Sequence, residues 1–256
     1  MKKIAIITGA SSGIGKQFVE TIESFGEMPD EIWVIARRLD RLTELKTACP
    51  LRPVAMDLTD RSKFQELQEM LREEQPDVRL LVNAGGFGKF EGTTETALED
   101  NWNMVDLNCQ AIQAMCQSTI PYMSNGSKII NIASVAALQP VPYINVYAAS
   151  KAFVLYYSRG LNRELKSRGI GVTAVCPFWT KTEFFNRAVR TDREPVVKKY
   201  AAMYEPEQIV ERAWRDVKRG RDVSKFGFVA RSQALLSKIM PHSFIMSFWM
   251  KQQKLK

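Results

Sequence analysis

The sequence predicts an α/β fold, a single domain in which a doubly wound parallel sheet carries helices on both faces. Short apolar runs alternate along the chain with longer amphipathic stretches of helical period. Such runs are typical of parallel strands buried on both faces, and each right-handed crossover places its helix on a face of the sheet. A glycine-rich turn, Thr8–Gly15, follows the first run and opens the first helix. We therefore expect a Rossmann-type three-layer sandwich.

The expected elements follow in chain order. Six apolar runs are predicted as strands: Ile4–Thr8, Ile32–Ile35, Pro53–Met56, Leu80–Val82, Lys128–Ile132 and Val172–Cys176. A last strand is expected at Phe226–Ala230. The helix-period segments are about Lys16–Phe25, the stretches after Asp40 and from the Thr59-Asp60 cap, Asn101–Ile120, Tyr147–Arg168, and the stretch from Glu205-Pro206. Proline suits the first turn of that last helix.

The composition excludes several classes of protein. Of the 256 residues, 45% are hydrophobic and 25% charged. No apolar run approaches the roughly 18 residues of a membrane span, and the run after Met1-Lys2-Lys3 is too short for a signal peptide, so we expect a cytoplasmic protein. The cysteines lack the spacing of metal ligands, so they are expected to be reduced core residues, with no metal: Cys49, Cys109, Cys116 and Cys176.

The net charge of +8 is scattered along the chain. A basic surface raises the local concentration of anions, which suits nucleic acid, a membrane surface or an anionic substrate. No recognition helix or base-stacking motif accompanies the charge, so nucleic acid is not expected as a partner. The only histidine, His242, lies in a hydrophobic tail without an acidic or serine partner at triad spacing. Histidine-based catalysis is therefore not expected.

The glycine turn predicts a site for a dinucleotide pyrophosphate. Glycines let the backbone approach the ligand, and the helix N-terminus supplies free N–H donors and partial positive charge. The residues expected at this site are Gly9, Ser11, Ser12, Gly13, Ile14 and Gly15. A glycine cluster alone is also typical of an ordinary strand-helix turn, but its position after the first strand favours a cofactor.

The end of the second strand predicts the form of that cofactor. An acidic residue about 20 residues past the glycines commonly binds the ribose 2′-hydroxyl, whereas Ala36-Arg37-Arg38 stands here. Guanidinium groups grip a 2′-phosphate bidentately, so Arg37 and Arg38 favour NADP(H). The alternative is that both arginines are solvated charges and that Asp40 binds the ribose.

Two further groups end the third and fourth strands. Asp57-Leu58 is expected to contact adenine, and Asn83-Ala84-Gly85 offers small residues where the cofactor passes. Either group alone could be an ordinary turn. Ligands of open α/β sheets bind at the carboxyl ends of successive strands, so together these groups extend the predicted cofactor site.

Tyr147 and Lys151 are four residues apart, which puts a phenol and an ammonium on one face of a helix. A neighbouring cation favours the ionised phenol and lowers its pKa from about 10, as acid/base work at neutral pH requires. Thirteen residues upstream, Ser134 follows the fifth strand, where its hydroxyl could bond a substrate oxygen. Asn108 lies in the long helix before that strand. Tyr143 has no lysine four residues on, so only Tyr147 is expected to act.

These motifs resemble the classical short-chain dehydrogenase/reductase family over about residues 1–230. The matches are Thr8–Gly15 for TGxxxGxG, Asn83–Gly85 for NAG, Asn108, Ser134, and Tyr147–Lys151 for YxxxK. The resemblance implies hydride transfer between nicotinamide and a small-molecule carbonyl or alcohol, with Tyr147 as general acid/base and Ser134 as carbonyl-orienting donor. It also implies that Lys151 tunes the phenol and binds ribose, and that Asn108 holds a water linking Lys151 to solvent.

Two departures from the family pattern fall near the substrate. The family usually has Pro-Gly after the sixth strand, whereas this chain has Pro177-Phe178-Trp179-Thr180. Pro177 and Thr180 remain as expected contacts of the nicotinamide. After Gly85 the chain continues Gly86-Phe87-Gly88, and this extra glycine is expected to alter the rim of the pocket.

Aromatic residues on loops above the nicotinamide favour a bulky apolar substrate: Phe87, Phe90, Tyr143, Phe178, Trp179, Phe184 and Phe185. The next stretch is basic, with Lys181, Arg187, Arg190, Arg193, Lys198 and Lys199. These charges would suit an anionic thioester, so 3-oxoacyl reduction is the alternative activity. A noncatalytic NADP(H)-binding sensor is the alternative of another class, and the intact set of catalytic residues argues against it.

The expected organisation is a dinucleotide-binding and catalytic domain at 1–230, with a substrate lid at about 178–204, and an apolar, basic helical tail at 231–256. The tail segment Pro241–Met250 is expected to pack on the protein or on a second subunit. Contact with a membrane surface is the less favoured alternative. We expect a homodimer or homotetramer.

Overall fold

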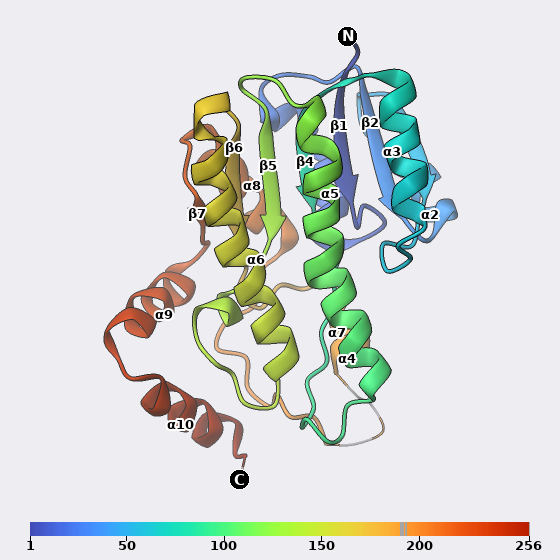
Figure 1. Ribbon diagram of the computed structural model, residues 1–256. Coiled ribbons are helices and arrows are strands. Elements are labelled where there is room, and N and C mark those ends of the chain that lie inside the picture. The colour runs from blue at the N-terminus through green and yellow to red at the C-terminus, as the bar shows by residue number, and fades with distance from the viewer. Residues whose placement is uncertain (190–191, 193, 256) are drawn as a thin grey trace.

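The computed structural model describes residues 1–189, 192 and 194–255. Its centre is a seven-stranded parallel sheet in the order β3-β2-β1-β4-β5-β6-β7 (Figure 1). The strands are β1 Lys3–Thr8, β2 Glu31–Ala36, β3 Leu51–Ala55, β4 Asp77–Asn83, β5 Lys128–Ile132, β6 Gly171–Val175 and β7 Val223–Ser224. The predicted doubly wound α/β fold is confirmed. Because the strand order reverses between β1 and β4, a crevice for a ligand is expected at their carboxyl ends.

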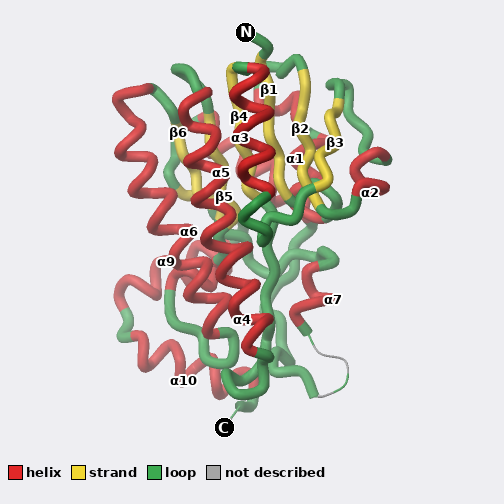
Figure 2. Tube along the Cα trace, turned by 45° about the vertical axis from the view of Figure 1, so that its right-hand side comes forward, coloured by secondary structure: helices red, strands yellow, loops and turns green. Residues whose placement is uncertain are grey.

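Helices cover both faces of this sheet (Figures 1 and 2), with α3, α5 and α6 on one face and α1 and α8 on the other. The helices are α1 Gly13–Glu20, α2 Leu39–Thr43, α3 Lys63–Glu74, α4 Leu98–Val105, α5 Ala111–Thr119, α6 Asn145–Glu164, α7 Phe184–Ala188, α8 Pro206–Lys218, α9 Phe228–Ile239 and α10 His242–Gln253. Short 3₁₀ turns occur at Ile22–Phe25, Ile120–Tyr122, Val135–Leu138 and Leu165–Arg168.

Two apolar cores enclose the sheet. In β1, Ile4 and Ile6 face the core shared with α3, α5 and α6, while Ala5 and Ile7 face the core shared with α1 and α8. All four side chains are fully buried. Because successive strand residues point to opposite faces, a strand covered on both faces carries apolar residues at most positions instead of at every second one. This burial on both faces explains the continuous apolar runs of the sequence.

The expected last strand at Phe226–Ala230 is wrong. The last strand is Val223–Ser224, and the chain turns into α9 after Gly227, whose φ is +85°. This left-handed conformation suits glycine and interrupts the extended chain. The buried residues of α9 are Ala230 and Ala234, which are four apart and so share one helix face. The last residues of the predicted strand therefore belong to α9, a helix that buries only the face with Ala230 and Ala234.

Two segments extend beyond the carboxyl ends of the strands. The first, the lid, contains α7, and its ends are joined because Lys181 N donates to Tyr204 O and Tyr204 N donates to Trp179 O, both at 2.9 Å. The second, the arm, consists of α9 and α10 (residues 228–253) and projects from one side of the sheet (Figure 1). Within the part of the chain that the structure describes, no helix is long and apolar enough to cross a membrane.

The arm contacts the body through both of its helices, and α9 lies beside the 3₁₀ turn Val135–Leu138. Its second helix, α10, also makes hydrogen bonds with the body. Trp249 Nε1 donates to the Pro142 oxygen at 3.1 Å. Gln253 is fully buried, and its amide accepts hydrogen bonds from the backbone nitrogens of Lys198 and Lys199 and donates to the Lys199 oxygen, at 2.8 to 3.0 Å. Other large apolar side chains of the arm remain exposed: Phe228, Leu235, Leu236, Ile239, Phe244 and Phe248.

Candidate active site

One elongated cavity of about 860 Å³ runs along the carboxyl ends of the strands, from the glycine turn to the arm. Most of the site residues predicted from the sequence line it: Gly9, Ser11, Ser12, Gly13, Ile14, Gly15, Arg37, Arg38, Asp57, Leu58, Ala84, Gly85, Ser134, Tyr147, Lys151, Pro177 and Thr180. Two predicted residues, Asn83 and Asn108, are not among the described residues that line the cavity. The fold therefore gathers seventeen of nineteen predicted residues around one space.

The glycine turn packs against the end of β4, backbone to backbone. A Cβ on Gly9 would lie 2.6 Å from the Gly85 nitrogen, and a Cβ on Gly15 would lie 2.3 Å from the Gly9 oxygen. Thr8 Oγ1 accepts from the Ala84 and Gly85 nitrogens at 3.2 and 3.4 Å. No side chain larger than hydrogen fits at these glycines. The result is a cradle of main-chain atoms at the start of α1, which fits a dinucleotide pyrophosphate.

Asn83 has a place inside the sheet. Its side chain is 1% exposed, and its Nδ2 donates to Asn131 Oδ1 of β5 at 2.8 Å. This hydrogen bond joins the side chains of two neighbouring strands below the cavity floor. Of the three residues of the NAG motif, only Ala84 and Gly85 line the cavity, whereas the sequence predicted that all three would contact the cofactor.

The arginines after β2 have unequal surroundings. Arg37 is largely exposed, and its Nη1 lies 4.0 Å from Asp57 Oδ2. Arg38 Nη2 donates to Ser11 Oγ of the glycine turn at 3.3 Å and to Glu183 Oε2 of the lid at 3.4 Å. Of the two, Arg38 is therefore the one held against the cradle. Asp40, the alternative ribose ligand, is not among the described residues that line the cavity.

Sequence reasoning missed Arg41 and Glu183. Arg41 Nη1 donates to both Glu183 oxygens, at 2.7 and 2.8 Å. The spacing could have identified Arg41, because it follows Arg38 by three residues and so lies one helical turn away. Glu183 is 142 residues from Arg41 along the chain, and only the fold brings them together.

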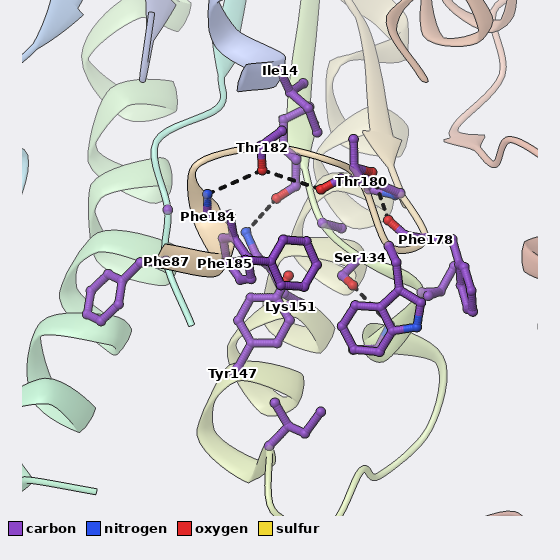
Figure 3. Close-up of a pocket in the computed structure, with 18 of the residues that line it drawn as sticks. Ile14, Phe87, Ser134, Tyr147, Lys151, Phe178, Thr180, Thr182, Phe184 and Phe185 are labelled. Atoms are coloured by element: carbon purple, nitrogen blue, oxygen red, sulfur yellow. Dashed lines mark hydrogen bonds between the residues drawn. The ribbon is translucent and has the colours of Figure 1, made fainter. Parts of the chain in front are cut away.

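Tyr147 and Lys151 lie on one face of α6, as their spacing predicts, and Ser134 approaches them from the end of β5 (Figure 3). Lys151 is 4% exposed, its Nζ donates to the Ile132 oxygen at 2.8 Å, and it lies 5.8 Å from the centre of the Tyr147 ring. Ser134 Oγ accepts from the Ala136 nitrogen at 3.1 Å, which fixes the hydroxyl at the start of a 3₁₀ turn. A phenol, an ammonium and a hydroxyl thus meet at the cavity wall.

Burial dominates the ionisation of both groups on α6. Burial raises the pKa of Tyr147 to about 12, and the neighbouring Ser134 side chain opposes only part of this shift. Burial lowers the pKa of Lys151 to about 8. The net shift of the Tyr147 pKa is therefore upward, opposite to the direction expected from a neighbouring cation alone. The physical reason is that burial removes the charged form of each group from water, which disfavours the phenolate and the ammonium alike.

Asn108 lies one layer behind the cavity, in a π-helical turn at Asp106–Gln110 that joins α4 to α5. Its Nδ2 donates to the Phe87 oxygen at 2.9 Å and to Ser150 Oγ at 3.0 Å, and its Oδ1 accepts from the Phe87 nitrogen at 3.1 Å. A Cβ on Gly86 would lie 2.9 Å from Asn108 Oδ1 and 3.3 Å from Lys151 Nζ. Asn108 therefore ties the loop after β4 to α6 beside Lys151.

Aromatic rings close the cavity around Tyr147. The Phe90 ring is the centre of this cluster, with its centroid 5.7 to 6.5 Å from those of Tyr147, Trp179, Phe184 and Phe185. The Phe184 centroid lies 5.5 Å from that of Tyr147. Figure 3 shows Phe87 pointing away from this group, and its ring instead lies under the Arg187 guanidinium at 3.3 Å.

Gly88, the second glycine of the loop after the NAG motif, packs against the Tyr147 ring. A Cβ on Gly88 would lie 2.8 Å from Tyr147 Cδ2 and 2.9 Å from Phe184 Cζ. Gly88 therefore lets the loop that carries Phe90 approach the Tyr147 ring.

The basic stretch divides by position. Arg187 and Lys199 line the cavity, while Lys181 pairs with Glu205 at 2.5 Å and Lys198 pairs with Glu194 at 2.7 Å. Arg190 and Arg193 lie outside the described residues.

Comparison with known proteins identifies the family. The family model described as short chain dehydrogenase matches residues 3–193, well over half of this chain. An NADP-dependent 3-hydroxy acid dehydrogenase of Escherichia coli O6:H1 is 30% identical over 219 residues, which cover 82% of this chain and 87% of that protein. The glycine betaine reductase of Emericella nidulans is 33% identical over 81% of this chain, but this chain spans only 17% of that protein.

Solved structures share the fold over nearly the whole chain. A short-chain dehydrogenase from Sphingobium yanoikuyae in complex with NADPH has a TM-score of 0.77 at 28% identity, covering 96% of this chain and 95% of that one. The bulky-bulky ketone specific alcohol dehydrogenase from Comamonas testosteroni has a TM-score of 0.73 at 27% identity, covering 96% and 94%. A 4-hydroxyisoleucine dehydrogenase complexed with NADH shares the fold at 20% identity, with a TM-score of 0.70 and coverage of 89% and 99%. This chain belongs to the short-chain dehydrogenase/reductase family and is an oxidoreductase that uses a nicotinamide cofactor.

Proposed function

We propose that this chain is an NADP(H)-dependent oxidoreductase that transfers a hydride between nicotinamide and a bulky, apolar carbonyl or alcohol. The observation that carries the proposal is the meeting of Tyr147, Ser134 and Lys151 at the wall of a cavity that begins at the glycine cradle. Nicotinamide supplies the redox chemistry in such a site. The chain has to bind and orient the reactants, exclude water, and move one proton.

Tyr147 carries that proton in our proposal. In reduction its hydroxyl donates to the carbonyl oxygen, and in oxidation the phenolate accepts the proton of the alcohol. The high pKa of about 12 keeps the phenol protonated at neutral pH, as donation in the reductive direction requires. Ser134 orients the same oxygen from β5, and Lys151 supplies the positive charge that stabilises the phenolate left after donation.

Asn108 acts through its neighbours. It holds the Phe87 backbone and the Ser150 hydroxyl, and Ser150 directly precedes Lys151 on α6. Its carbonyl oxygen lies on the Gly86 side, where Lys151 Nζ also lies. We propose that Asn108 positions Lys151 and holds the water through which the proton lost by Tyr147 is replaced.

The preference for NADP(H) rests on the arginines after β2. Ala36 stands where a carboxylate would accept a hydrogen bond from a free 2′-hydroxyl, and Arg38 is held beside Ser11 at the cradle. A phosphate bound by one or two guanidinium contacts implies a preference for NADPH of roughly ten- to several-hundred-fold, at about 1.5–3 kcal/mol for each charge-assisted hydrogen bond. Arg37 and Asp57 are the remaining proposed contacts on the adenosine side, with Leu58 beside them.

A bulky apolar substrate is favoured by the aromatic walls and by the arm. Phe90 and Phe184 pack beside Tyr147, and Trp179 packs against Phe90. The cavity continues between apolar arm residues: Val229, Leu236, Met240, Phe244, Ile245, Phe248 and Trp249. An apolar wall on two sides of the reacting group binds a substrate with large groups on the carbonyl. The Comamonas relative, which is described as specific for bulky-bulky ketones, agrees with this proposal.

An alternative substrate is a 3-oxoacyl thioester. The favouring observation is that two cationic side chains, Arg187 and Lys199, line the same cavity, where they could bind the anionic part of an acyl carrier. Arg187 already has an anionic partner, Asp100, at 3.6 Å, which weakens this argument.

One experiment tests the function and ranks these substrates. A panel of aryl ketones, long-chain ketones, small aldehydes and 3-oxoacyl thioesters is incubated with NADPH or NADH, and oxidation is followed at the nicotinamide absorbance. We expect the highest kcat/KM for bulky ketones with NADPH. Turnover confined to thioesters supports the alternative. Equal kcat/KM for both cofactors with one common substrate contradicts the proposed NADP(H) preference.

We also propose that the protein is a homo-oligomer that associates through α4 and α6. These neighbouring helices expose large apolar side chains: Leu98, Trp102, Val105, Phe153 and Tyr156. Contiguous exposed apolar residues of this kind mark association surfaces. The mass in solution, measured by light scattering, is expected to be a multiple of 29.1 kDa, and Trp102→Glu is expected to lower it.

A further inference from the structure

Glu183 links the lid to the arginines that follow β2. Its carboxylate accepts two hydrogen bonds from Arg41 at 2.7 and 2.8 Å and one from Arg38 at 3.4 Å. Arg41 holds the pKa of this carboxyl below its usual range, so the group is an anion at neutral pH. The lid also reaches the cradle here, because a Cβ on Gly13 would lie 3.0 Å from Thr182 Cγ2.

The donors around Glu183 form an anion site. Arg38 Nη2 lies between the carboxylate and Ser11 Oγ of the glycine turn, and both Arg38 and Ser11 line the cavity. Carboxylates and phosphates accept the same charge-assisted hydrogen bonds from guanidinium groups. Two anions at one pair of arginines repel each other, so a phosphate and the Glu183 carboxylate compete for these donors.

We propose that Arg38, Arg41 and Ser11 bind the 2′-phosphate of NADP(H). The Glu183 carboxylate occupies the same arginines in the absence of the phosphate, and its ion pairs with them break when the phosphate binds. The inference rests on the proposed cofactor preference and deepens it. Glu183 is then a specificity-determining residue. Its ion pairs must be broken for NADPH, whereas NADH has no phosphate that competes with them.

The exchange also connects cofactor recognition to the reacting phenol. Glu183 immediately precedes Phe184, whose ring packs 5.5 Å from that of Tyr147. Once Arg38 and Arg41 bind phosphate, the lid loses its ion pairs to the β2 side of the cavity. The position of the segment that covers Tyr147 thus depends on the occupant of the arginine site.

The test measures binding without turnover. The affinities of 2′,5′-ADP and 5′-AMP are determined by calorimetry for the unmodified protein and for Glu183→Gln, which keeps the size of the side chain and removes its charge. Exposed ion pairs are weak, so we expect Glu183→Gln to bind 2′,5′-ADP about two- to fivefold more tightly. The affinity for 5′-AMP should not change. Arg41→Ala should weaken 2′,5′-ADP about tenfold and affect 5′-AMP less.

A matched control is Glu211→Gln on α8, which removes the same charge from an exposed pair with Arg215 at 3.4 Å, away from the cavity. It should leave both affinities unchanged. The inference is overturned if Glu183→Gln weakens 2′,5′-ADP, leaves it unchanged, or alters both nucleotides equally, since the carboxylate then only holds the lid. If the proposed preference for NADP(H) is itself wrong, the unmodified protein binds 2′,5′-ADP no more tightly than 5′-AMP. That result contradicts the inference too, and it is seen without any substitution.

Discussion

The ammonium of Lys151 lies 5.8 Å from the centre of the Tyr147 ring and is anchored by a 2.8 Å hydrogen bond to the Ile132 oxygen at the end of β5. One helix supplies both groups, and the sheet fixes the direction of the longer side chain. Both are removed from water, which raises one pKa and lowers the other toward neutrality. At neutral pH the Tyr147 phenol therefore stays protonated, while the neighbouring Lys151 ammonium loses its charge as the pH rises through about 8.

The phenol is expected to be indispensable for turnover. Tyr147→Phe removes the proton donor and keeps the ring that packs against Phe90 and Phe184. We expect kcat to fall about 10²–10⁴-fold, the usual contribution of a general acid or base, with little change in the Kd of NADPH. The control is Tyr122→Phe, a partly buried tyrosine that does not line the cavity and lies outside the proposed association surface, which should keep full activity. A Tyr147→Phe protein with most of its kcat contradicts the assignment.

The pH profile of reduction should report Lys151. Because burial lowers its pKa to about 8, the ammonium is present below that pH and is lost as the pH rises through it. Tyr147 stays protonated over this range, since its pKa is about 12. We expect kcat/KM for reduction to fall above about pH 8. In Lys151→Arg the guanidinium stays charged, so the fall should disappear. A profile that is flat between about pH 7 and 10 in the unmodified protein opposes this role.

Gly88 should be essential for the geometry of the phenol. The Cβ of Gly88→Ala would lie 2.8 Å from Tyr147 Cδ2, closer than side chains pack. Overpacking costs about 1–3 kcal/mol, so we expect kcat/KM to fall about tenfold or more. Gly160→Ala is the matched control, because no atom lies within 4 Å of the added Cβ and helix α6 favours alanine. It should raise the free energy of unfolding by up to about 1 kcal/mol and leave the kinetics unchanged.

The two arginines next to Ala36 should differ in their effect on the cofactor. Arg38 is held against the cradle, whereas Arg37 is largely exposed with only a 4.0 Å contact to Asp57. We expect Arg38→Ala to raise the KM for NADPH about tenfold or more and Arg37→Ala to raise it less. The KM for NADH should change little in both variants. Equal effects of the two substitutions on NADPH would assign the phosphate to both arginines.

The arm should depend on one buried amide. Gln253→Ala removes three hydrogen bonds to the backbone of Lys198 and Lys199 and leaves these partly buried groups without that partner. The expected loss is about 1–3 kcal/mol, which lowers Tm by roughly 2–4 °C per kcal/mol in a protein of this size. Because the arm lines the cavity, the KM for a bulky ketone should rise. Ser247→Ala, an exposed position of the same helix, is the control and should change neither quantity.

The sequence by itself determined the sheet and the motifs because both are local. A strand buried on both faces is predominantly apolar, so β1, β2, β4, β5 and β6 can be recognised in the sequence as apolar runs. Tyr147 and Lys151 share a helix face by spacing alone. The cradle requires glycines because a Cβ added at Gly9 or Gly15 would lie 2.3 to 2.6 Å from backbone atoms. The one strand predicted wrongly, Phe226–Ala230, has an apolar composition that suits a strand or a helix equally, and Gly227 decided between them.

Tertiary structure decided everything that depends on residues distant in the chain. Glu183 meets Arg41 across 142 residues, and Gly88 meets the Tyr147 ring, without any signal in the spacing. The ionisation of Tyr147 and Lys151 was also beyond the sequence, since their spacing predicts attraction whereas their burial sets the direction of both pKa shifts. Local chemistry names the reacting groups, but desolvation and long-range contacts, which exist only once the chain has folded, set their energies.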